Sequence, residues 1–111
     1  MPKILSIVIP AYNEEAYIGR LLKLIGEVSL SSLDLTMELI VVNDCSSDRT
    51  AGIVSKIPDV RLVNHKTNSG KGRAVRRGLK AVTGDYVLIQ DADLEYDPQE
   101  YLALLPPLLN G

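Results

Sequence analysis

The feature that most constrains the fold of this chain is a regular alternation of short apolar runs with segments of helical period. Four runs have the character of buried strands: Ile4 to Ile9, Glu38 to Asn43, Val60 to Asn64 and Asp85 to Gln90. Between them, apolar residues recur every three or four positions, as on one face of a helix. Strands that alternate with helices form a parallel sheet through right-handed crossovers. The sequence therefore predicts a doubly wound α/β fold with a mostly parallel sheet and helices on both faces.

Polar residues mark the expected ends of the helices. Asn13 is positioned to cap the first helix, and a polar residue at 47 or 48 is positioned to cap a short second one. The third helix is expected over Lys71 to Val82, with Leu79 among its inward side chains. Gly84 is the expected stop that follows it.

Composition narrows the function classes. The chain has 111 residues, of which 46% are hydrophobic and 23% charged, as in a soluble globular domain. A net charge of -2 disfavours a nucleic-acid partner. Cys45 is the single cysteine, so an internal disulfide is excluded and a cytoplasmic, reducing location is expected. Because no apolar stretch approaches the roughly 20 residues of a membrane span, any membrane association would be peripheral or come from other parts of a longer enzyme.

In open parallel sheets, ligands bind beyond the carboxyl ends of the strands, so the loops that follow the strands are the candidate sites. The first loop, residues 10–14, has no glycine, which excludes the G-x-G-x-x-G turn of dinucleotide-binding folds. It offers instead the ring of Tyr12 and the carboxylate of Glu14 at a helix start. The alternative interpretation is a capped helix start with no ligand.

The second and third loops offer an acid and two glycines. Asp44 ends the second strand, where its carboxylate could accept a hydrogen bond from a base N–H or a ribose hydroxyl. An Asx turn is the alternative interpretation. Gly70 and Gly72 let the backbone approach a ligand, and the helix start at Lys71 offers N–H groups to a phosphate or a base. A plain turn is the alternative there.

The fourth loop is the most informative segment. In an extended chain Asp91, Asp93 and Glu95 point to one side, with Ala92 and Leu94 turned inward. Clustered carboxylates repel one another unless a positive charge lies between them. A divalent cation bound by one or two carboxylates and by substrate phosphate oxygens fits Mg²⁺ or Mn²⁺. The alternative is an acidic turn that precedes a helix.

The expected third helix carries a basic face. Arg73, Arg76, Arg77 and Lys80 lie on one side of it by helical spacing. A solvated surface explains such a face, and an anionic membrane surface is the alternative.

Four stretches together carry a family resemblance. Residues 7–14, 42–48, 68–72 and 91–93 occur in this order, each beyond a predicted strand, and the chain thereby resembles glycosyltransferase family 2. The resemblance covers nearly the whole chain and implies the donor half of a nucleotide-diphospho-sugar transferase fold, the GT-A fold. Residues 90–98 are similar to the polyprenyl-phosphate branch, which includes the dolichyl-phosphate mannose and glucose synthases.

The resemblance implies roles for the loop residues. Tyr12 and Glu14 would border the nucleoside, Asp44 would contact the base, and Gly70 and Lys71 would lie near the base or the phosphates. The donor-binding residues implied are Pro10, Tyr12, Glu14, Asp44, Gly70, Lys71, Asp91, Ala92 and Asp93.

The metal ligands implied by the resemblance follow the fourth strand. Asp91 would touch the ribose or a metal-linked water, and Asp93 would ligate Mg²⁺ or Mn²⁺ together with the diphosphate. Glu95 occupies a position that Gln fills in some of these synthases, where it also serves the metal.

The family reaction transfers a hexose, with inversion, from a UDP- or GDP-sugar to an acceptor such as a polyprenyl phosphate. In this family the base that activates the acceptor lies well past the metal motif, so it is expected beyond residue 111. Residues 1–111 are then a truncated, donor-binding part without the acceptor-binding part, and this part is expected to be inactive alone. The parent enzyme is expected to act at the cytoplasmic face of a membrane, and self-association is a further expectation.

Two other functions stay open at this point. The first is a module that binds nucleotides without chemistry. The second is an unrelated doubly wound domain, such as a receiver-like switch with Asp44 as its phosphoacceptor.

Overall fold

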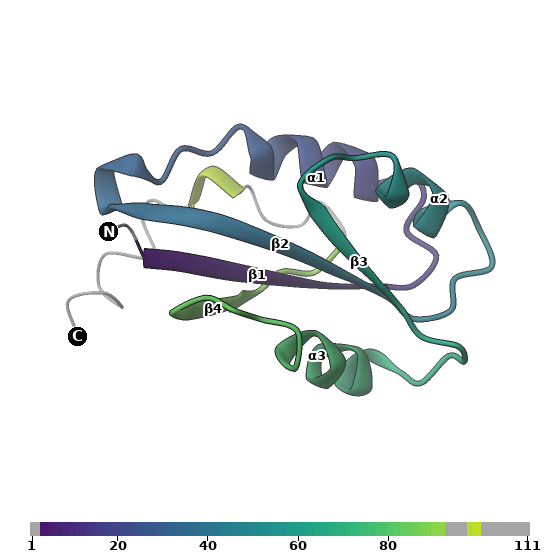
Figure 1. Ribbon diagram of the computed structural model, residues 1–111. Helices are drawn as coiled ribbons and strands as arrows, with labels where there is room; N and C mark the ends of the chain where they lie inside the picture. The colour runs from purple at the N-terminus through teal and green to yellow at the C-terminus, as the bar shows by residue number, and fades with distance from the viewer. Residues whose placement is uncertain (1–2, 93–97, 101–111) are drawn as a thin grey trace.

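The computed structural model describes residues 3–92 and 98–100 (Figure 1). Its strands are β1 (Lys3–Ala11), β2 (Leu35–Asn43), β3 (Val60–Asn64) and β4 (Tyr86–Ile89). Its α-helices are α1 (Ile18–Gly26), α2 (Thr50–Ser55) and α3 (Lys71–Leu79), and two 3-10 helices, η1 (Ser31–Leu33) and η2 (Pro98–Glu100), complete the described elements.

The four strands form one parallel sheet in the order β3-β2-β1-β4. From the central strand β1 the chain moves outward to β2 and β3, and it then returns to the other side of β1 as β4. The strand order therefore reverses between β1 and β4. In an open α/β sheet, this reversal leaves a crevice at the carboxyl ends of the two strands, where ligands bind. The predicted parallel α/β sheet is confirmed.

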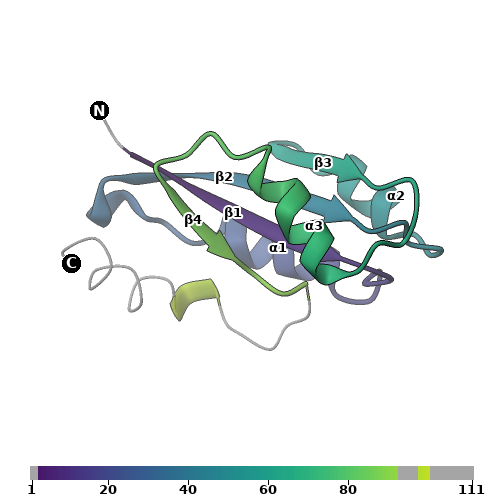
Figure 2. The same cartoon turned by 90° about the horizontal axis from the view of Figure 1, so that it is seen from below.

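Helices cover both faces of the sheet, as predicted. Helices α1 and α2 lie on one face and α3 lies on the other (Figures 1 and 2). On the first face, Ile7 and Ile9 of β1 pack in one buried cluster with Ile18 and Leu21 of α1. On the second face, Val8 of β1 is part of a buried cluster with Ala74 of α3 and with two side chains of β2. Because β1 is buried on both sides, its sequence from Ile4 to Ala11 is apolar except for Ser6.

Helix α3 lies very close to the sheet because its contact positions are small. A Cβ atom on Gly78 would lie 2.4 Å from Cγ1 of Val8, a distance that no side chain there could accept without movement. Ala74, one turn earlier, is also fully buried. This close packing fixes the first turn of α3 beside the carboxyl end of β1.

The first helix begins later than predicted. Asn13 does not cap it: the helix starts at Ile18, and Asn13 instead has a positive φ of 52°. The side-chain oxygen of Asn13 accepts a hydrogen bond from the backbone N–H of Ser47 at 2.8 Å. The Asn13 side chain, which the sequence assigned to the helix N-terminus, thus forms a contact between two loops instead.

The third helix ends earlier than predicted. It stops at Leu79 rather than Val82, and the Leu79 side chain is 44% exposed instead of inward. Gly84 lies beyond the helix, where its N–H donates to the hydroxyl of Ser6 in β1 at 2.9 Å. Among the residues that the structure describes, no helix is long and apolar enough to cross a membrane.

Candidate functional site

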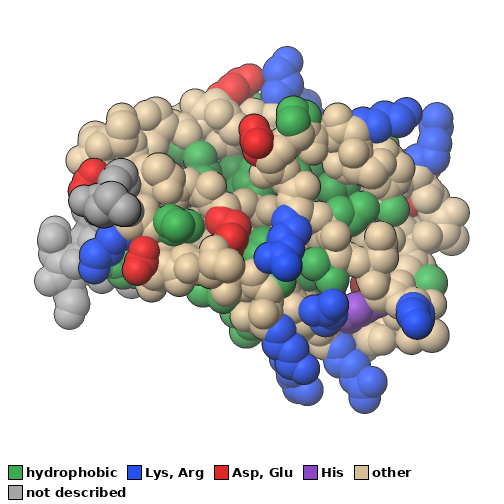
Figure 3. Space-filling model, viewed as in Figure 1, with side chains coloured by type: hydrophobic (Ala, Val, Ile, Leu, Met, Phe, Trp, Pro, Cys, Tyr) green, Lys and Arg blue, Asp and Glu red, His purple; other side chains and the backbone are tan. Residues whose placement is uncertain are grey.

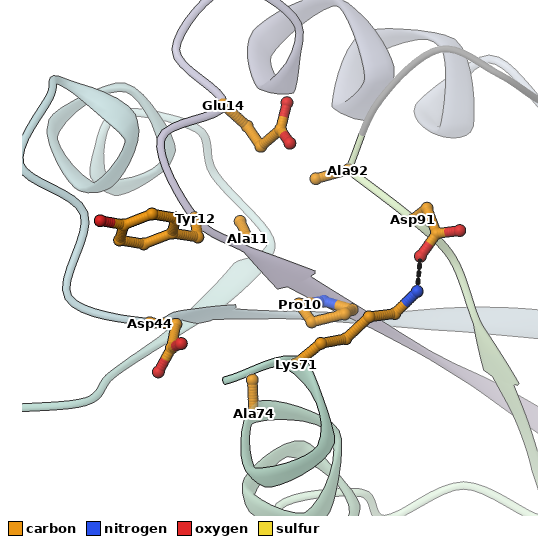
Figure 4. Close-up of a pocket in the computed structure, with 9 residues that line it drawn as sticks. All are labelled: Pro10, Ala11, Tyr12, Glu14, Asp44, Lys71, Ala74, Asp91 and Ala92. Atoms are coloured by element: carbon orange, nitrogen blue, oxygen red, sulfur yellow. Dashed lines mark hydrogen bonds and ion pairs between the residues drawn. The ribbon is translucent and has the colours of Figure 1, made fainter. Parts of the chain in front are cut away.

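A pocket opens where the strand order reverses. It has a volume of about 290 Å³ and lies at the carboxyl ends of β1 and β4, beside the first turn of α3 (Figure 4). Figure 4 shows Tyr12 and Asp44 on one side of the pocket and Lys71 with Asp91 on the other. The lining residues are Pro10, Ala11, Tyr12, Glu14, Asp44, Lys71, Ala74, Asp91 and Ala92.

The end of β1 and the loop that follows it form one wall of the pocket. Tyr12 in this loop is 47% exposed, so one face of its ring is open to a ligand. The backbone N–H of Glu14 donates to the Thr50 hydroxyl at 2.9 Å, and the N–H of Asn13 donates to the Ser46 hydroxyl at 3.0 Å. These bonds to the loop after β2 and to the first residue of α2 hold the wall in place without a ligand.

Asp44 is anchored by three hydrogen bonds at the end of β2. Its Oδ1 accepts from the backbone N–H of Ser69 at 2.9 Å and lies 2.9 Å from Nδ1 of His65. Its Oδ2 accepts from the backbone N–H of Gly70 at 2.8 Å. The side chain of Asp44 is only 5% exposed. The carboxylate therefore joins the end of β2 to the loop that leads into α3.

The anchoring bonds also set the charge state of Asp44. Burial by itself would raise the pKa of this carboxyl, but the N–H of Ser69, the His65 ring and the N–H of Gly70 together hold the pKa below its ordinary value. Asp44 is thus a carboxylate at neutral pH. A receiver-like phosphoacceptor needs an accessible oxygen, and both oxygens of Asp44 already accept hydrogen bonds, so the geometry disfavours that alternative.

Gly70 permits this arrangement. Its φ of 91° and ψ of 161° belong to a region of backbone space that is essentially limited to glycine. The conformation turns the N–H groups of Ser69 and Gly70 toward Asp44 just before α3 begins. Gly70 does not line the pocket itself; it directly precedes Lys71 of α3, which does.

His65 is the site residue that sequence reasoning missed. It directly follows β3, and its ring is 14% exposed beside Asp44. The signal that could have found it was its position, since Asp44 follows β2 in the same way and the carboxyl ends of parallel strands meet at one edge of the sheet.

The opposite wall of the pocket is an ion pair. The ammonium group of Lys71, in the first turn of α3, contacts the carboxylate of Asp91, which follows β4 (Figure 4). The two side chains are 63% and 37% exposed, far more than Asp44. Ala92 is buried, as its predicted inward orientation requires.

The predicted metal site is described only in part. Asp93 and Glu95 lie outside the described residues, and within the described ranges no group of three or more potential ligand side chains gathers. Asp91 itself fits a cation, because a positive charge already lies against its carboxylate in the pocket. The oxygen ligand is also of the hard type that Mg²⁺ and Mn²⁺ take.

The structure brings most of the predicted donor-binding residues together. Those that line the one pocket are Pro10, Tyr12, Glu14, Asp44, Lys71, Asp91 and Ala92. Gly70 is not a lining residue but donates to Asp44, which is one, and Ala11 and Ala74 line the pocket without having been predicted.

Comparisons with known proteins agree with this architecture. The family described as Glycosyl transferase family 2 matches residues 6–111. A dolichyl-phosphate beta-glucosyltransferase of Dictyostelium discoideum is 39% identical over 99 residues, which cover 80% of this chain and 30% of that protein. The chain thus spans less than a third of the length of this curated relative.

Solved structures are similar in fold as well as in sequence. The structure of S. aureus TarS 1–349 in complex with UDP-GlcNAc has a TM-score of 0.79 at 31% identity and covers 99% of this chain and 31% of that one. The mannosyltransferase PcManGT from Pyrobaculum calidifontis, in complex with GDP-Man and Mn²⁺, has a TM-score of 0.75 at 29% identity and covers 93% of this chain and 31% of that one.

Proposed function

Because the chain belongs to glycosyl transferase family 2, we propose that residues 1–111 form the donor-binding part of an inverting, metal-dependent hexosyltransferase. The observation that carries the proposal is the pocket at the strand-order reversal, with an open ring on one side and a lysine–aspartate pair on the other. Family membership removes the unrelated receiver-like domain from the alternatives. A nucleotide-binding module without chemistry stays as the second candidate.

The Tyr12 side of the pocket suits the nucleoside. The half-exposed ring of Tyr12 offers a surface on which a base or ribose can pack. Asp44 supplies a fixed negative charge at the far end of this side, and the remaining lone pair of its Oδ2 can accept from a base N–H. Similarity to structures that hold UDP-GlcNAc in one case and GDP-Man in the other supports a nucleotide-sugar donor and leaves uridine and guanosine both as candidates.

The Lys71 side suits the diphosphate. The ammonium group of Lys71 and the N–H groups in the first turn of α3 are positive, and a diphosphate placed between them and Tyr12 would be neutralised. Asp91, together with Asp93 and Glu95, would hold Mg²⁺ or Mn²⁺ on this side. A bound divalent ion offsets the charge of the diphosphate and makes the nucleoside diphosphate a better leaving group.

The reaction we propose is a single displacement. An acceptor oxygen attacks the anomeric carbon of the hexose while the bond to the diphosphate oxygen breaks, and the configuration at that carbon inverts. The described residues orient the donor; the base that accepts the proton of the acceptor is expected beyond residue 111. We therefore expect residues 1–111 to bind the donor and to transfer no sugar alone.

The name of the curated relative supports a lipid acceptor. That protein is a dolichyl-phosphate glucosyltransferase, so we propose that the parent enzyme of this chain uses a polyprenyl phosphate and works at the cytoplasmic face of a membrane. A sugar-transfer assay separates the two candidate functions. A chain extended beyond residue 111 should transfer hexose, whereas a binding module should not.

Calorimetry tests the donor site. The chain is titrated with UDP and with GDP, with and without Mn²⁺, and one of the two should bind more tightly when the metal is present. Asp91→Asn should lose this metal-dependent gain, while the matched variant Asp34→Asn, at an exposed position with φ of 56°, should keep it. A folded chain that binds neither nucleotide at millimolar concentration would contradict the proposal.

A further inference from the structure

Basic charge is concentrated in one short segment of this acidic chain. Residues 71–80 carry five of the twelve Lys and Arg side chains and none of the fourteen Asp and Glu side chains, although the net charge of the whole chain is -2. The segment coincides with α3 and its C-cap residue. Its first member, Lys71, belongs to the donor pocket, and the other four are not used by the proposed function.

These four side chains form what we call the basic face of α3: Arg73, Arg76, Arg77 and Lys80. All four are exposed, and they line a shallow groove of about 300 Å³ together with His65 and Ser69. In Figure 3, Lys and Arg side chains project from the lower edge of the molecule, where α3 lies in Figure 1, and the single histidine lies beside them.

No carboxylate neutralises the basic face within the described part of the chain. The ion pairs found there join Arg49 to Glu15, His65 to Asp44, and Lys71 to Asp91. On the same side of the sheet, Glu38 already accepts hydrogen bonds from Ser6 and Thr83. The helix dipole gains from the cations near its C-terminus, but that gain requires only one or two of them.

An exposed apolar side chain accompanies the cations. Leu79 lies between Arg77 and Lys80 in the sequence and is exposed. A soluble polyanion would meet the cations but offer nothing to Leu79. A bilayer interface satisfies both kinds of side chain, since phosphates meet the cations and the acyl boundary takes the apolar group.

We propose that the basic face of α3 binds the surface of an anionic phospholipid bilayer. The inference extends the proposed function, because the same helix begins in the donor pocket with Lys71 and Ala74. Helix α3 resting on lipid would hold the mouth of the pocket beside the membrane, where a lipid-phosphate acceptor resides.

Vesicle co-sedimentation of the 111-residue chain tests the proposal. The vesicles are phosphatidylcholine alone, or phosphatidylcholine with about one-third phosphatidylglycerol, at physiological and at high salt. The test variant is Arg73→Gln/Arg76→Gln/Arg77→Gln. The matched control is Arg20→Gln/Lys23→Gln/Lys56→Gln, which removes the same charge from exposed positions on α1 and just after α2, on the other face of the sheet.

The wild type and the control should bind the anionic vesicles with similar affinity, and the test variant should bind roughly 100-fold more weakly. High salt should weaken the binding of the wild type. Equal losses in both triple variants would overturn the proposal, because net charge alone would then explain binding. Equal binding to both vesicle types would overturn it too, as would tighter binding of the face to heparin than to vesicles.

Nucleotide titration of the same three proteins separates this inference from the proposed function. All three should bind the nucleotide equally, because the substituted side chains do not line the donor pocket. A wild-type chain that binds anionic vesicles but binds no nucleotide would contradict the donor site alone. Normal nucleotide binding without any preference for anionic vesicles would contradict the membrane face alone.

Discussion

The two sides of the donor pocket are built in different ways. On the side of Asp44, three hydrogen bonds fix a nearly buried carboxylate and, through it, the loop that leads into α3. On the side of Asp91, one ion pair between an exposed lysine and a partly exposed aspartate forms the wall. The first side is part of the fold and needs no ligand. The second is a balance of charges that a diphosphate and a cation could rearrange without unfolding anything.

Removing the carboxylate of Asp44 should have the largest effect on stability. Asp44→Ala leaves the N–H groups of Ser69 and Gly70 without their acceptor, which should cost about 2–4 kcal/mol of unfolding free energy. Urea denaturation measures the loss, and Asp34→Asn, which removes an exposed carboxylate, is the control. If the Asp44 variant were as stable as the control, the contrast between the two sides would be lost.

Changing the loop backbone should have the next largest effect. Gly70→Ala places a side chain at φ 91°, which should cost about 1–3 kcal/mol although nothing lies within 4 Å of the added Cβ. Gly72→Ala is the matched control: its Cβ also meets open space, but its backbone is helical, so it should be neutral or stabilising by up to about 1 kcal/mol. Thermal unfolding of both variants checks the difference, and equal melting temperatures would be the contrary outcome.

Acid should weaken the fold through its anchored carboxylates. Although burial opposes it, hydrogen bonds hold the pKa values of Asp44, Asp48 and Glu38 below their ordinary values. A depressed folded-state pKa gives stability that is present above the unfolded pKa of about 4 and is lost as the pH falls through the folded value. The urea concentration at the midpoint of unfolding should therefore decrease as the pH is lowered below about 4. Asp44→Asn should flatten this dependence; an unchanged slope would show that Asp44 contributes nothing to it.

The Lys71–Asp91 ion pair should have the smallest effect on stability and the largest effect on nucleotide affinity. Lys71→Gln and Asp91→Asn should each change the unfolding free energy by less than about 1 kcal/mol, because both side chains are accessible to solvent. In the calorimetric titration, Lys71→Gln should weaken nucleotide binding with or without Mn²⁺, and Asp91→Asn should remove only the part that depends on Mn²⁺. A large stability loss in either variant would contradict the proposed difference between the walls.

The sequence predicted the frame of the site because parallel strands buried on both faces have an unmistakable pattern. The β3 strand was predicted with its observed bounds, Val60–Asn64, and the loops that follow the strands do meet at one pocket. Asp44 and Asp91 could be singled out because each directly follows a predicted strand. The position of a residue directly after a parallel strand is thus sufficient to place it at the edge of the sheet where the pocket lies.

The details that could not be predicted depend on contacts between distant segments. Asn13 has the right type for a helix cap, yet its oxygen accepts a hydrogen bond from the N–H of Ser47 in the loop after β2. Leu79 has the right type for a core, yet α3 turns Ala74 and Gly78 to the sheet, and the next residue lies about 100° further around the helix. His65 has no motif of its own, since its partner Asp44 lies 21 residues away.

The central claim is that the pocket between the ends of β1 and β4 holds a nucleoside diphosphate with a divalent cation on the Asp91 side. Amide NMR spectra of the chain with UDP or GDP, first with Mg²⁺ and then with traces of paramagnetic Mn²⁺, test it directly. We predict shifts at Tyr12 and Gly70 on addition of nucleotide, and broadening by Mn²⁺ that is strongest from Asp91 to Asp93. Broadening centred elsewhere, for example at Glu38 or Asp59, with Asp91 and Ala92 unaffected, would contradict the account.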